Sequence, residues 1–390
     1  MADQYDPKFD VPEGTTTDKS IRIKALYIHP VKSCGPIEVN RALLTKIGFL
    51  YDRCFAFASE VPDEESRTHS KWRFISQRTK PMMSLIKTEL WLPHEKSPSS
   101  DPLVQAGGCA VLTFEDPDAA GWVERLETFF YTRSCDAKPQ LSFIVPLQPT
   151  AAQMDEFQIK MRPFGIHSRD AQGLDMGGIP SVAAALPKLK KFLGVPESQA
   201  LTLLKCTPDT LTRTDRNLAP LAHIGTPSVH GYTDQQPINI NSLSSVHAVS
   251  ALLPPENQPL NALRFRANIW LTGAPAYDEE TWKRYRILPK GGGAEPRADV
   301  APTMGGFDAD QPPPGRKRGK PQPSTTLVRH RTVEDGNKAA LGYLGMHCVP
   351  EDRSLTEARA QNAGLYVEVG DEIEVLQRGE HLYGSTANDY

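Results

Sequence analysis

Short runs of alternating apolar and polar residues, separated by turn residues, recur along the first half of the chain. Runs of this length and period are typical of β-strands. A chain with many short strands and frequent turns favours a small barrel or sandwich. We predict strands over residues 21–28, 54–58, 85–91, 110–114 and 141–145.

Apolar residues at helical spacing form two stripes further along. The first ends at Gly194 and Pro196, which terminate a helix. A stripe of this kind usually faces a hydrophobic core, so both are interpreted as core rather than as binding surfaces. Their members are Val182, Leu186, Leu189, Phe192 and Leu193, and then Leu243, Val246, Val249 and Leu253.

A length of 390 residues predicts two domains. The pattern divides the chain into a disordered tail (1–19), a first β-rich domain (20–178), a connecting helix (179–200), a second domain (201–379) and a tail (380–390). One segment of the second domain stands out, because residues 289–323 hold eight prolines and seven glycines. Such a composition predicts a disordered insert.

Composition then narrows the function. A net charge of −3 gives no support for binding nucleic acid or a membrane surface. The acidic residues of the N-terminus argue against a transit peptide and no apolar anchor is found, so we expect a cytoplasmic protein. The six cysteines are scattered, which argues against zinc and iron–sulfur motifs.

The run Arg264-Phe265-Arg266-Ala267-Asn268-Ile269 is the first candidate for chemistry. Read as a strand, it places both guanidinium groups on one face of a sheet. Such a pair calls for a carboxylate or a phosphate, although a structural salt bridge is an equal alternative. Arg329 and Arg331, two residues apart as well, are expected to face solvent or to pair with Glu334.

A second candidate is the turn His29-Pro30-Val31-Lys32-Ser33-Cys34-Gly35, which follows the first predicted strand. Its lysine and hydroxyl both suit an oxyanion. Arg53, in a later turn before residues 54–58, is a further candidate anion ligand.

These segments carry a resemblance. The chain resembles MOSC-domain proteins, the C-terminal domain type of molybdenum cofactor sulfurases, preceded by their N-terminal β-barrel domain. Within that superfamily it is most similar to the amidoxime-reducing component branch, in a form typical of fungi. The matching motifs are residues 29–35, 52–53, 74–78, 232–237, 264–269, 344–346 and 369–371.

The resemblance implies a mixed β-rich α+β fold with two barrel domains and a bound molybdenum–pterin cofactor. Phosphate and pterin need cations, hydroxyls and amides, while molybdenum takes sulfur donors. By resemblance, Lys32, Ser33 and Arg53 meet the polar end of the cofactor. Arg266 and Asn268 meet it from the other domain.

Three further residues are implied less directly. Gln235 and Gln236 occupy positions where relatives carry small hydroxyl residues, so a bulkier amide takes their place. Asp234 is a candidate for orienting a ligand or handling a proton.

The expected cysteine ligand of the metal is missing. Relatives place it in the interval that corresponds here to residues 289–323, which contain no cysteine. Three explanations compete, in this order: an error in the gene model or reading frame, a diverged member that has lost the ligand, or a cysteine elsewhere that reaches the metal. Cys348 is interpreted as a buried thiol on a strand rather than as that ligand.

The resemblance implies an oxidoreductase that reduces N-hydroxylated or N-oxide small molecules. Its electrons would come from an external donor, which in this family is a b-type cytochrome with its flavin reductase. The alternative is a non-catalytic protein that binds or carries the cofactor. The pyridoxal-phosphate-dependent sulfurase domain has no counterpart in this sequence.

Overall fold

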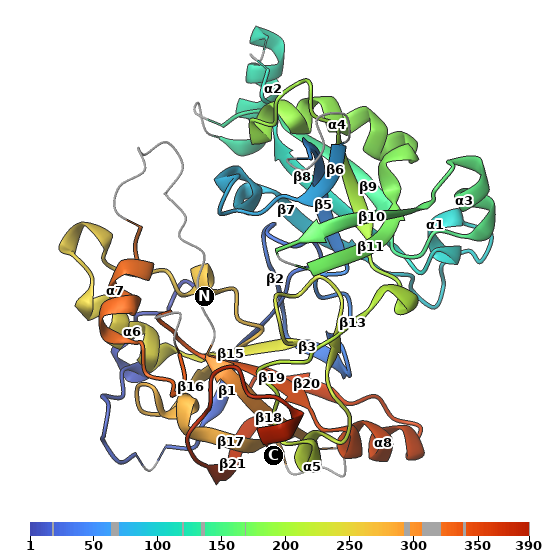
Figure 1. The fold of residues 1–390 in the computed structure, drawn as a ribbon. Coiled ribbons are helices and arrows are strands. Elements are labelled where there is room, and N and C mark those ends of the chain that lie inside the picture. Colours follow the sequence, from blue (N-terminus) through green and yellow to red (C-terminus); the bar gives the residue numbers. More distant parts are fainter. Residues whose placement is uncertain are drawn as a thin grey trace. The chain divides into compact units, whose positions relative to one another are not determined.

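The computed structural model describes residues 1–17, 19–63, 70–118, 121–133, 137–167, 169–291, 297–305, 321–337 and 341–389. They form two compact units (Figure 1). Unit 1 comprises Met1–Ile28, Glu38–Asp52 and Leu211–Tyr390, and unit 2 comprises His29–Ile37 and Arg53–Thr210. Strands with interspersed helices build both units, which confirms the predicted β-rich α+β class.

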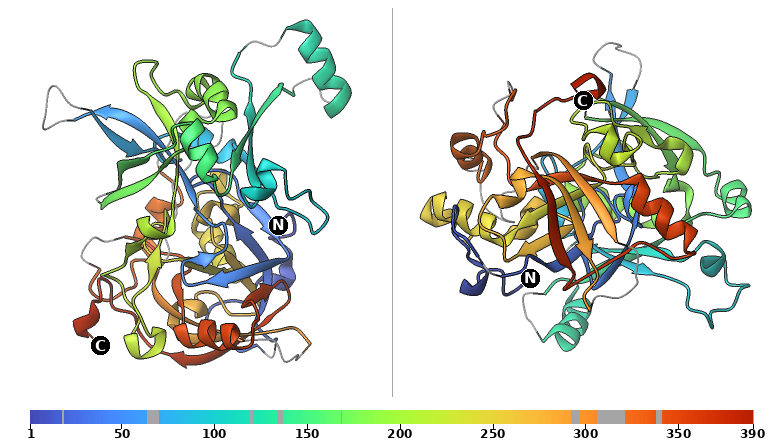
Figure 2. Two further views of the ribbon diagram at one scale, coloured as in Figure 1. Left: turned by 90° about the vertical axis from the view of Figure 1, so that its right-hand side faces the viewer. Right: turned by 90° about the horizontal axis from the view of Figure 1, so that it is seen from below.

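Seven strands form the frame of unit 1. They are β1 (Arg22–Ile28), β15 (Ile238–Ser242), β16 (Ile269–Thr272), β17 (Trp282–Leu288), β18 (Ala298–Gly305), β19 (Met346–Pro350) and β21 (Glu372–Arg378). Their order is β16-β15-β19-β18-β17-β21-β1, and β1 pairs back with β16 to close the ring. Figure 2 shows the orange and red strands of this ring from below. Closure removes the exposed edges that an open sheet would leave.

Smaller elements of unit 1 surround this ring. They are β2 (Ile37–Val39, which begins in unit 2), β3 (Arg41–Thr45), β4 (Gly48–Phe49), β13 (Thr212–Arg213), β14 (Val229–His230), β20 (Tyr366–Glu368), α5 (Leu221–Ile224), α6 (Leu243–Leu252), α7 (Ser324–His330) and α8 (Asp352–Ala360). The predicted stripe on α6 is core: Val246 and Val249 are buried in one cluster with Trp270 of β16 and Ala25 of β1.

The first strand does not lie where the sequence analysis placed it. We expected residues 21–28 in the N-terminal barrel, but β1 pairs antiparallel with β16, with Leu26 opposite Ile269. Strand β1 therefore belongs to unit 1. A period of two reveals a strand but not its partner.

Two other parts of the predicted division are wrong as well. Phe9, in the predicted disordered tail 1–19, is buried in a core cluster of unit 1. Leu201–Lys205, predicted to begin the second domain, forms a strand that pairs with Phe55–Pro62 in unit 2. The remaining boundaries stay predictions.

The proline- and glycine-rich segment is only partly what we predicted. Residues 289–323 were expected to be disordered, yet β18 runs from Ala298 to Gly305 between β17 and β19. Val300 is buried opposite Tyr285 on one side and Pro350 on the other. Burial of a few apolar residues in the ring outweighs the local composition. Residues 292–296 and 306–320 lie outside the described residues.

Unit 2 combines a five-stranded barrel with a three-stranded sheet. The barrel follows the order β10-β11-β12-β5-β6, and the sheet follows β7-β8-β9. The strands are β5 (Phe55–Pro62), β6 (Ser70–Phe74), β7 (Lys87–Trp91), β8 (Cys109–Glu115), β9 (Gln140–Pro146), β10 (Met161–Ile166), β11 (Arg169–Asp175) and β12 (Leu201–Lys205). The helices are α1 (Pro102–Gln105), α2 (Trp122–Thr132), α3 (Ala151–Glu156) and α4 (Pro180–Leu193).

Helix α4 forms where the connecting helix was predicted, but it lies within unit 2 and does not join the two units. Its sequence explains its bounds. Pro180 occupies the first turn, where a missing N–H costs nothing, and Gly194 ends the helix at φ 61°. The helix packs against β9 and β12, with Val182 and Leu189 buried. Its stripe is therefore core of unit 2. In the described ranges, no helix combines the length and apolar content needed to cross a bilayer.

Asn268 holds the closure of the ring in unit 1. Its Nδ2 donates to the carbonyl of Tyr27 at 3.1 Å, and its Oδ1 accepts from the backbone N–H of Asn239 at 3.1 Å. Its own N–H donates to the carbonyl of Asn239, and its carbonyl accepts from Tyr27. At 1% exposure, these groups have little access to water. One side chain thus ties β15 to β1.

Replacing Asn268 with alanine should therefore destabilise unit 1. The change leaves the carbonyl of Tyr27 and the N–H of Asn239 without their side-chain partner, at a cost of about 2–4 kcal/mol. Thermal unfolding followed by circular dichroism measures the loss. Asn388→Ala, which removes an exposed amide near the C-terminus, should change the midpoint very little. Equal midpoints for the two variants would contradict this role.

Candidate functional site

The predicted oxyanion turn lies in unit 2 and is fixed to the start of β5. The N–H of Lys32 donates to the carbonyl of Phe55 at 2.8 Å, and the N–H of Phe55 donates to the carbonyl of Pro30 at 3.0 Å. The N–H of Arg53 donates to the carbonyl of His29 at 2.8 Å. These bonds hold the backbones of the turn and of Arg53 next to one another.

Two of the three predicted residues adopt an unusual backbone conformation. Ser33 has φ 71° and Arg53 has φ 47°. Residues other than glycine, asparagine and aspartate rarely adopt this left-handed conformation, which costs them roughly 1–2 kcal/mol. Such strain gathers at binding and catalytic sites, where surrounding contacts hold it in place. It supports a functional reading of this turn.

Lys32 adds a buried positive charge to the same turn. Lys32 is only 7% exposed, and its Nζ lies 5.5 Å from the centre of the Phe74 ring. A desolvated ammonium group interacts strongly with aromatic rings and with anions. Ser33 is 5% exposed beside it. The turn thus offers a cation and a hydroxyl in a protected place.

The arginine segment of unit 1 is not the strand that we predicted. Ala262–Phe265 forms a 3-10 turn, which begins because the side chain of Asn261 accepts the N–H of Leu263. Arg266 caps this turn at φ 54°, and β16 begins only at Ile269. The two guanidinium groups therefore do not share one face of a sheet. The side-chain capping bond outweighs the strand preference of the run.

The amide groups of the predicted glutamines have partners within unit 1. Gln235 Oε1 accepts from Asn217 Nδ2 at 2.9 Å. Gln236, 3% exposed, accepts from Ser228 Oγ and donates to the carbonyl of Asn217. Asp234, by contrast, is exposed in the same turn. Together with Asn268, whose amide ties β15 to β1, these glutamines have a structural use, and their contact with a cofactor stays a prediction.

The strand that should carry the metal ligand contains no cysteine. Cys348 of β19 lies opposite Pro302 of β18, is fully buried, and donates from Sγ to the carbonyl of Met346 at 3.5 Å. Burial raises the pKa of its thiol far above the ordinary range, although the neighbouring Tyr285 hydroxyl opposes the rise. Among the described residues, no three histidines, cysteines or acids are placed to hold a metal.

Another cysteine lies beside the oxyanion turn of unit 2. Cys54 follows Arg53 and is half-buried, whereas the other four cysteines in the described ranges are buried. Its Sγ is 3.6 Å from the carbonyl of Pro30. If a cysteine outside the expected interval reaches a metal, Cys54 is the best placed by exposure.

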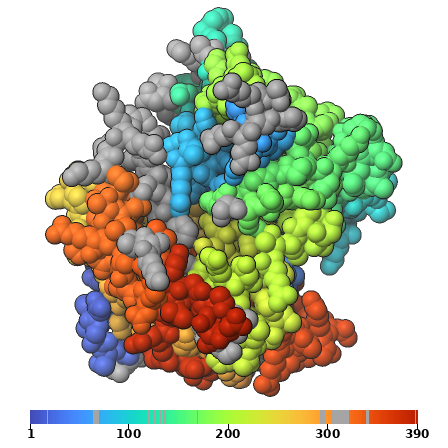
Figure 3. Space-filling model, in the orientation of Figure 1, coloured from blue at the N-terminus to red at the C-terminus, as the bar shows by residue number. Residues whose placement is uncertain are grey.

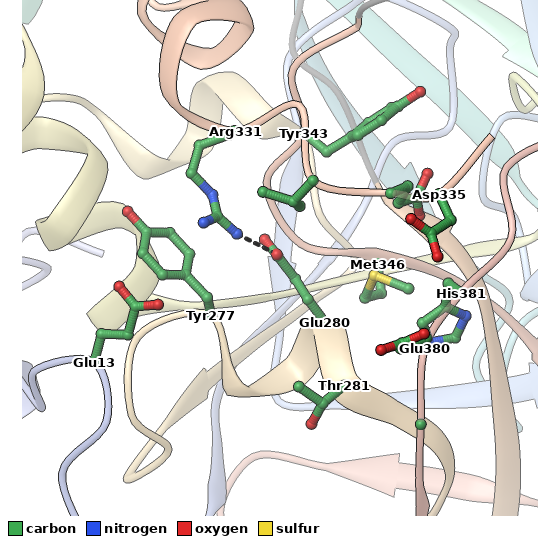
Figure 4. Close-up of a pocket in the computed structure, with 13 residues that line it drawn as sticks. Glu13, Tyr277, Glu280, Thr281, Arg331, Asp335, Tyr343, Met346, Glu380 and His381 are labelled. Carbon is green, nitrogen blue, oxygen red and sulfur yellow. Dashed lines mark hydrogen bonds and ion pairs between the residues drawn. The ribbon is translucent and has the colours of Figure 1, made fainter. Parts of the chain in front are cut away.

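Sequence reasoning missed a cavity of about 380 Å³ in unit 1. Arg331 was expected to face solvent or to pair with Glu334, but it is 9% exposed and pairs with Glu280 (Figure 4). Its guanidinium carbon lies 3.6 Å from the centre of the Tyr277 ring. The acidic run Asp278-Glu279-Glu280 was the available signal in the sequence.

Two family models match the chain. The MOSC N-terminal beta barrel domain matches residues 20–116, and the MOSC domain matches residues 227–374. Together they span more than half of the sequence, and this chain is a MOSC-domain protein. MOSC domains are associated with molybdenum-cofactor-binding proteins. Comparison with curated proteins gave no match.

The reactivity of the cysteines tests the buried state of Cys348. In the native protein, iodoacetamide should alkylate Cys348 at least about tenfold more slowly than Cys54, because a buried thiol with a raised pKa forms little thiolate. Peptide mass spectrometry after timed labelling measures both rates. Labelling in urea should remove the difference. Equal native rates would show that Cys348 is accessible.

Glu280 predicts a pH dependence of stability. Burial raises its pKa from 4.5 to about 8; Arg331 opposes the rise, and Glu279 and Glu334 add to it. The folded protein therefore holds this proton more tightly than the unfolded chain. The stability that Glu280 contributes is fully present below pH 4.5 and is lost as the pH rises through about 8.

The free energy of unfolding of the wild type minus that of Glu280→Gln should therefore fall as the pH rises from 4.5 to about 8. Urea unfolding at four pH values in this range measures the difference. Glu357→Gln, which changes an exposed carboxylate on α8, should give a nearly constant difference. A difference for Glu280→Gln that stays constant or rises would contradict the raised pKa.

Proposed function

We propose that this protein is a molybdenum-cofactor-binding oxidoreductase that reduces N-hydroxylated or N-oxide compounds with electrons from an external donor. The observation that supports it most is the turn of unit 2. There Lys32 is buried and Ser33 has a left-handed backbone conformation, and both residues lie within the stretch matched by the MOSC N-terminal beta barrel domain. A phosphorylated pterin needs this kind of protected positive site.

The donor set fits the polar end of the cofactor better than it fits the metal. Lys32, Ser33 and Arg53, all in unit 2, would hold the phosphate. Arg266, Gln235, Gln236 and Asn268, all in unit 1, stay candidates from the family resemblance alone. When bound, the cofactor supplies oxygen-atom transfer and two-electron chemistry. The residues of this chain bind it, orient it and exclude water from it, and the exposed Asp234 would move a proton at the rim.

A second candidate function rests on the missing thiolate. Strand β18 carries no cysteine, and Cys348 is fully buried with a raised pKa. A protein with the cation set but without a thiolate would bind or carry the cofactor and would catalyse nothing. The electron donor of the first candidate, a b-type cytochrome with its flavin reductase, would then have no role.

Purified full-length protein separates the two candidates. The oxidoreductase should contain molybdenum and pterin and should reduce benzamidoxime when the cytochrome and flavin reductase are added. The carrier should contain both without reducing the substrate. Purified protein that contains neither molybdenum nor pterin would contradict both candidate functions. Sequencing the transcript across Asp299–Pro323 completes the test, because a cysteine in another reading frame would restore the metal ligand.

Substitution in the turn tests the binding residues directly. Lys32→Ala and Arg53→Ala should each lower the retained pterin and molybdenum about tenfold to hundredfold, since a charged hydrogen bond contributes about 1.5–3 kcal/mol. Metal analysis and pterin fluorescence measure the retention. Lys87→Ala, which removes an exposed lysine of β7, is the matched control. Unchanged retention in all three variants would exclude this turn as the site.

A further inference from the structure

The cavity beside Glu280 lies wholly within unit 1 and is lined by none of the residues predicted to bind the cofactor. Its wall comes from the N-terminal segment, the turn before β17, the segment after α7 and the segment after β21. In Figure 3, the orange and red parts of the chain that include the last two segments lie at the surface of one face. The lining residues are Glu13, Tyr277, Glu280, Thr281, Arg331, Val333, Glu334, Asp335, Tyr343, Met346, Gly379, Glu380 and His381.

Glu280 lies in the middle of this cavity, and only one oxygen of its carboxyl group has a partner among the described residues. One oxygen, Oε2, pairs with Arg331 (Figure 4). The other oxygen, Oε1, is buried and accepts no hydrogen bond from any described residue. A buried carboxylate oxygen without a donor costs about 1–3 kcal/mol or more. Arg331 is held against the Tyr277 ring, so the guanidinium has a fixed position on the Oε2 side of the carboxylate.

The charge around the cavity selects the kind of donor. Besides Glu280, four acidic side chains line it, against one arginine and one histidine. A hollow bordered by one sign of charge concentrates ions of the opposite sign. No described group of three acids, histidines or cysteines is placed to hold a metal ion, so the expected cation is organic rather than metallic.

The walls and the size set the remaining chemistry. Tyr277, Tyr343, Val333 and Met346 give the cavity aromatic and apolar surface beside its carboxylates. A volume of about 380 Å³ falls at the lower end of small-molecule pockets. Apolar surface and a carboxylate together suit a molecule with a compact apolar body and a positively charged nitrogen group.

We propose that this cavity binds a small organic cation, whose N–H groups donate to Glu280 Oε1 and whose apolar body packs against Tyr277 and Met346. The site is independent of the cofactor proposed above. The ligand takes the place of the donor that Oε1 lacks, and Arg331 keeps the carboxylate oriented.

Proton release should accompany binding. Burial raises the pKa of Glu280 to about 8, so near pH 7 its carboxyl group carries a proton. An arriving cation favours the ionised form and expels that proton. The other titratable groups that line the cavity or lie beside Glu280 are Glu13, Tyr277, Glu279, Lys283, Arg331, Glu334, Asp335, Tyr343, Glu380 and His381.

The probe is 2-phenylethylammonium, measured by isothermal titration calorimetry on the full chain at pH 7. We expect saturable binding with release of close to one proton, obtained by repeating the titration in buffers of different ionisation enthalpy. The uncharged analogue 2-phenylethanol should bind at least tenfold more weakly. Equal binding of the two probes, or no binding of either, would overturn the proposal.

Three variants locate the binding. Glu280→Gln should weaken binding at least tenfold and abolish the proton release, and circular dichroism shows whether it is folded. Glu380→Gln removes an exposed carboxylate of the lining without touching Glu280, and it should weaken binding several-fold while proton release persists. Glu357→Gln on α8 should bind like the wild type. Unchanged affinity in both Glu280→Gln and Glu380→Gln would place any binding elsewhere and overturn the proposal.

Discussion

The closure of the ring between β1 and β16 is the constraint on which unit 1 depends. The two strands lie far apart in the sequence, and Asn268 reaches a carbonyl 241 positions away in Tyr27. Contacts so distant in sequence are entropically costly to form, so a buried amide with several partners is a suitable fastener. The same residue lies two positions after Arg266, whose left-handed backbone leads the chain into the strand. The closure therefore fixes the conformation of the whole arginine segment.

Two neighbouring glutamates of one short turn have different roles, one in the structure of unit 1 and one in the cavity. Glu279 is fully buried and accepts from the N–H of Ser242 and from the hydroxyl of Ser245, so it anchors the start of α6. Glu280, the next residue, points into the cavity and shares only one oxygen with Arg331. Burial raises the pKa of both carboxyl groups. The two residues differ in their hydrogen bonds. Both carboxylate oxygens of Glu279 accept a hydrogen bond, whereas Oε1 of Glu280 accepts none from the described residues.

The sequence predicted the class of fold and the position of the turn that holds Lys32 and Ser33, because both depend on local patterns. Strand periodicity, the cap of α4 at Gly194 and the lysine–serine turn are all readable within a few residues. The partners of a strand cannot be read from a few residues, which is why β1 was assigned to the wrong barrel. Asn261 overturned the predicted arginine strand through one capping bond, and β18 formed in spite of its prolines because the ring buries it. The pair of Glu280 and Arg331 joins residues 51 positions apart, and no local pattern indicates such a pair.

The cysteines bear on the choice between oxidoreductase and carrier. A metal bound at Cys348 would require a thiolate inside the ring, where β18 and β15 flank the residue on both sides. Charging that thiol without solvent is costly, and reaching it would require separating paired strands. Cys54 has neither obstacle, since it is half-buried and follows Arg53 in the turn. A metal-binding form of this exact sequence would therefore draw its thiolate from unit 2, from a position other than the one that the MOSC resemblance implies.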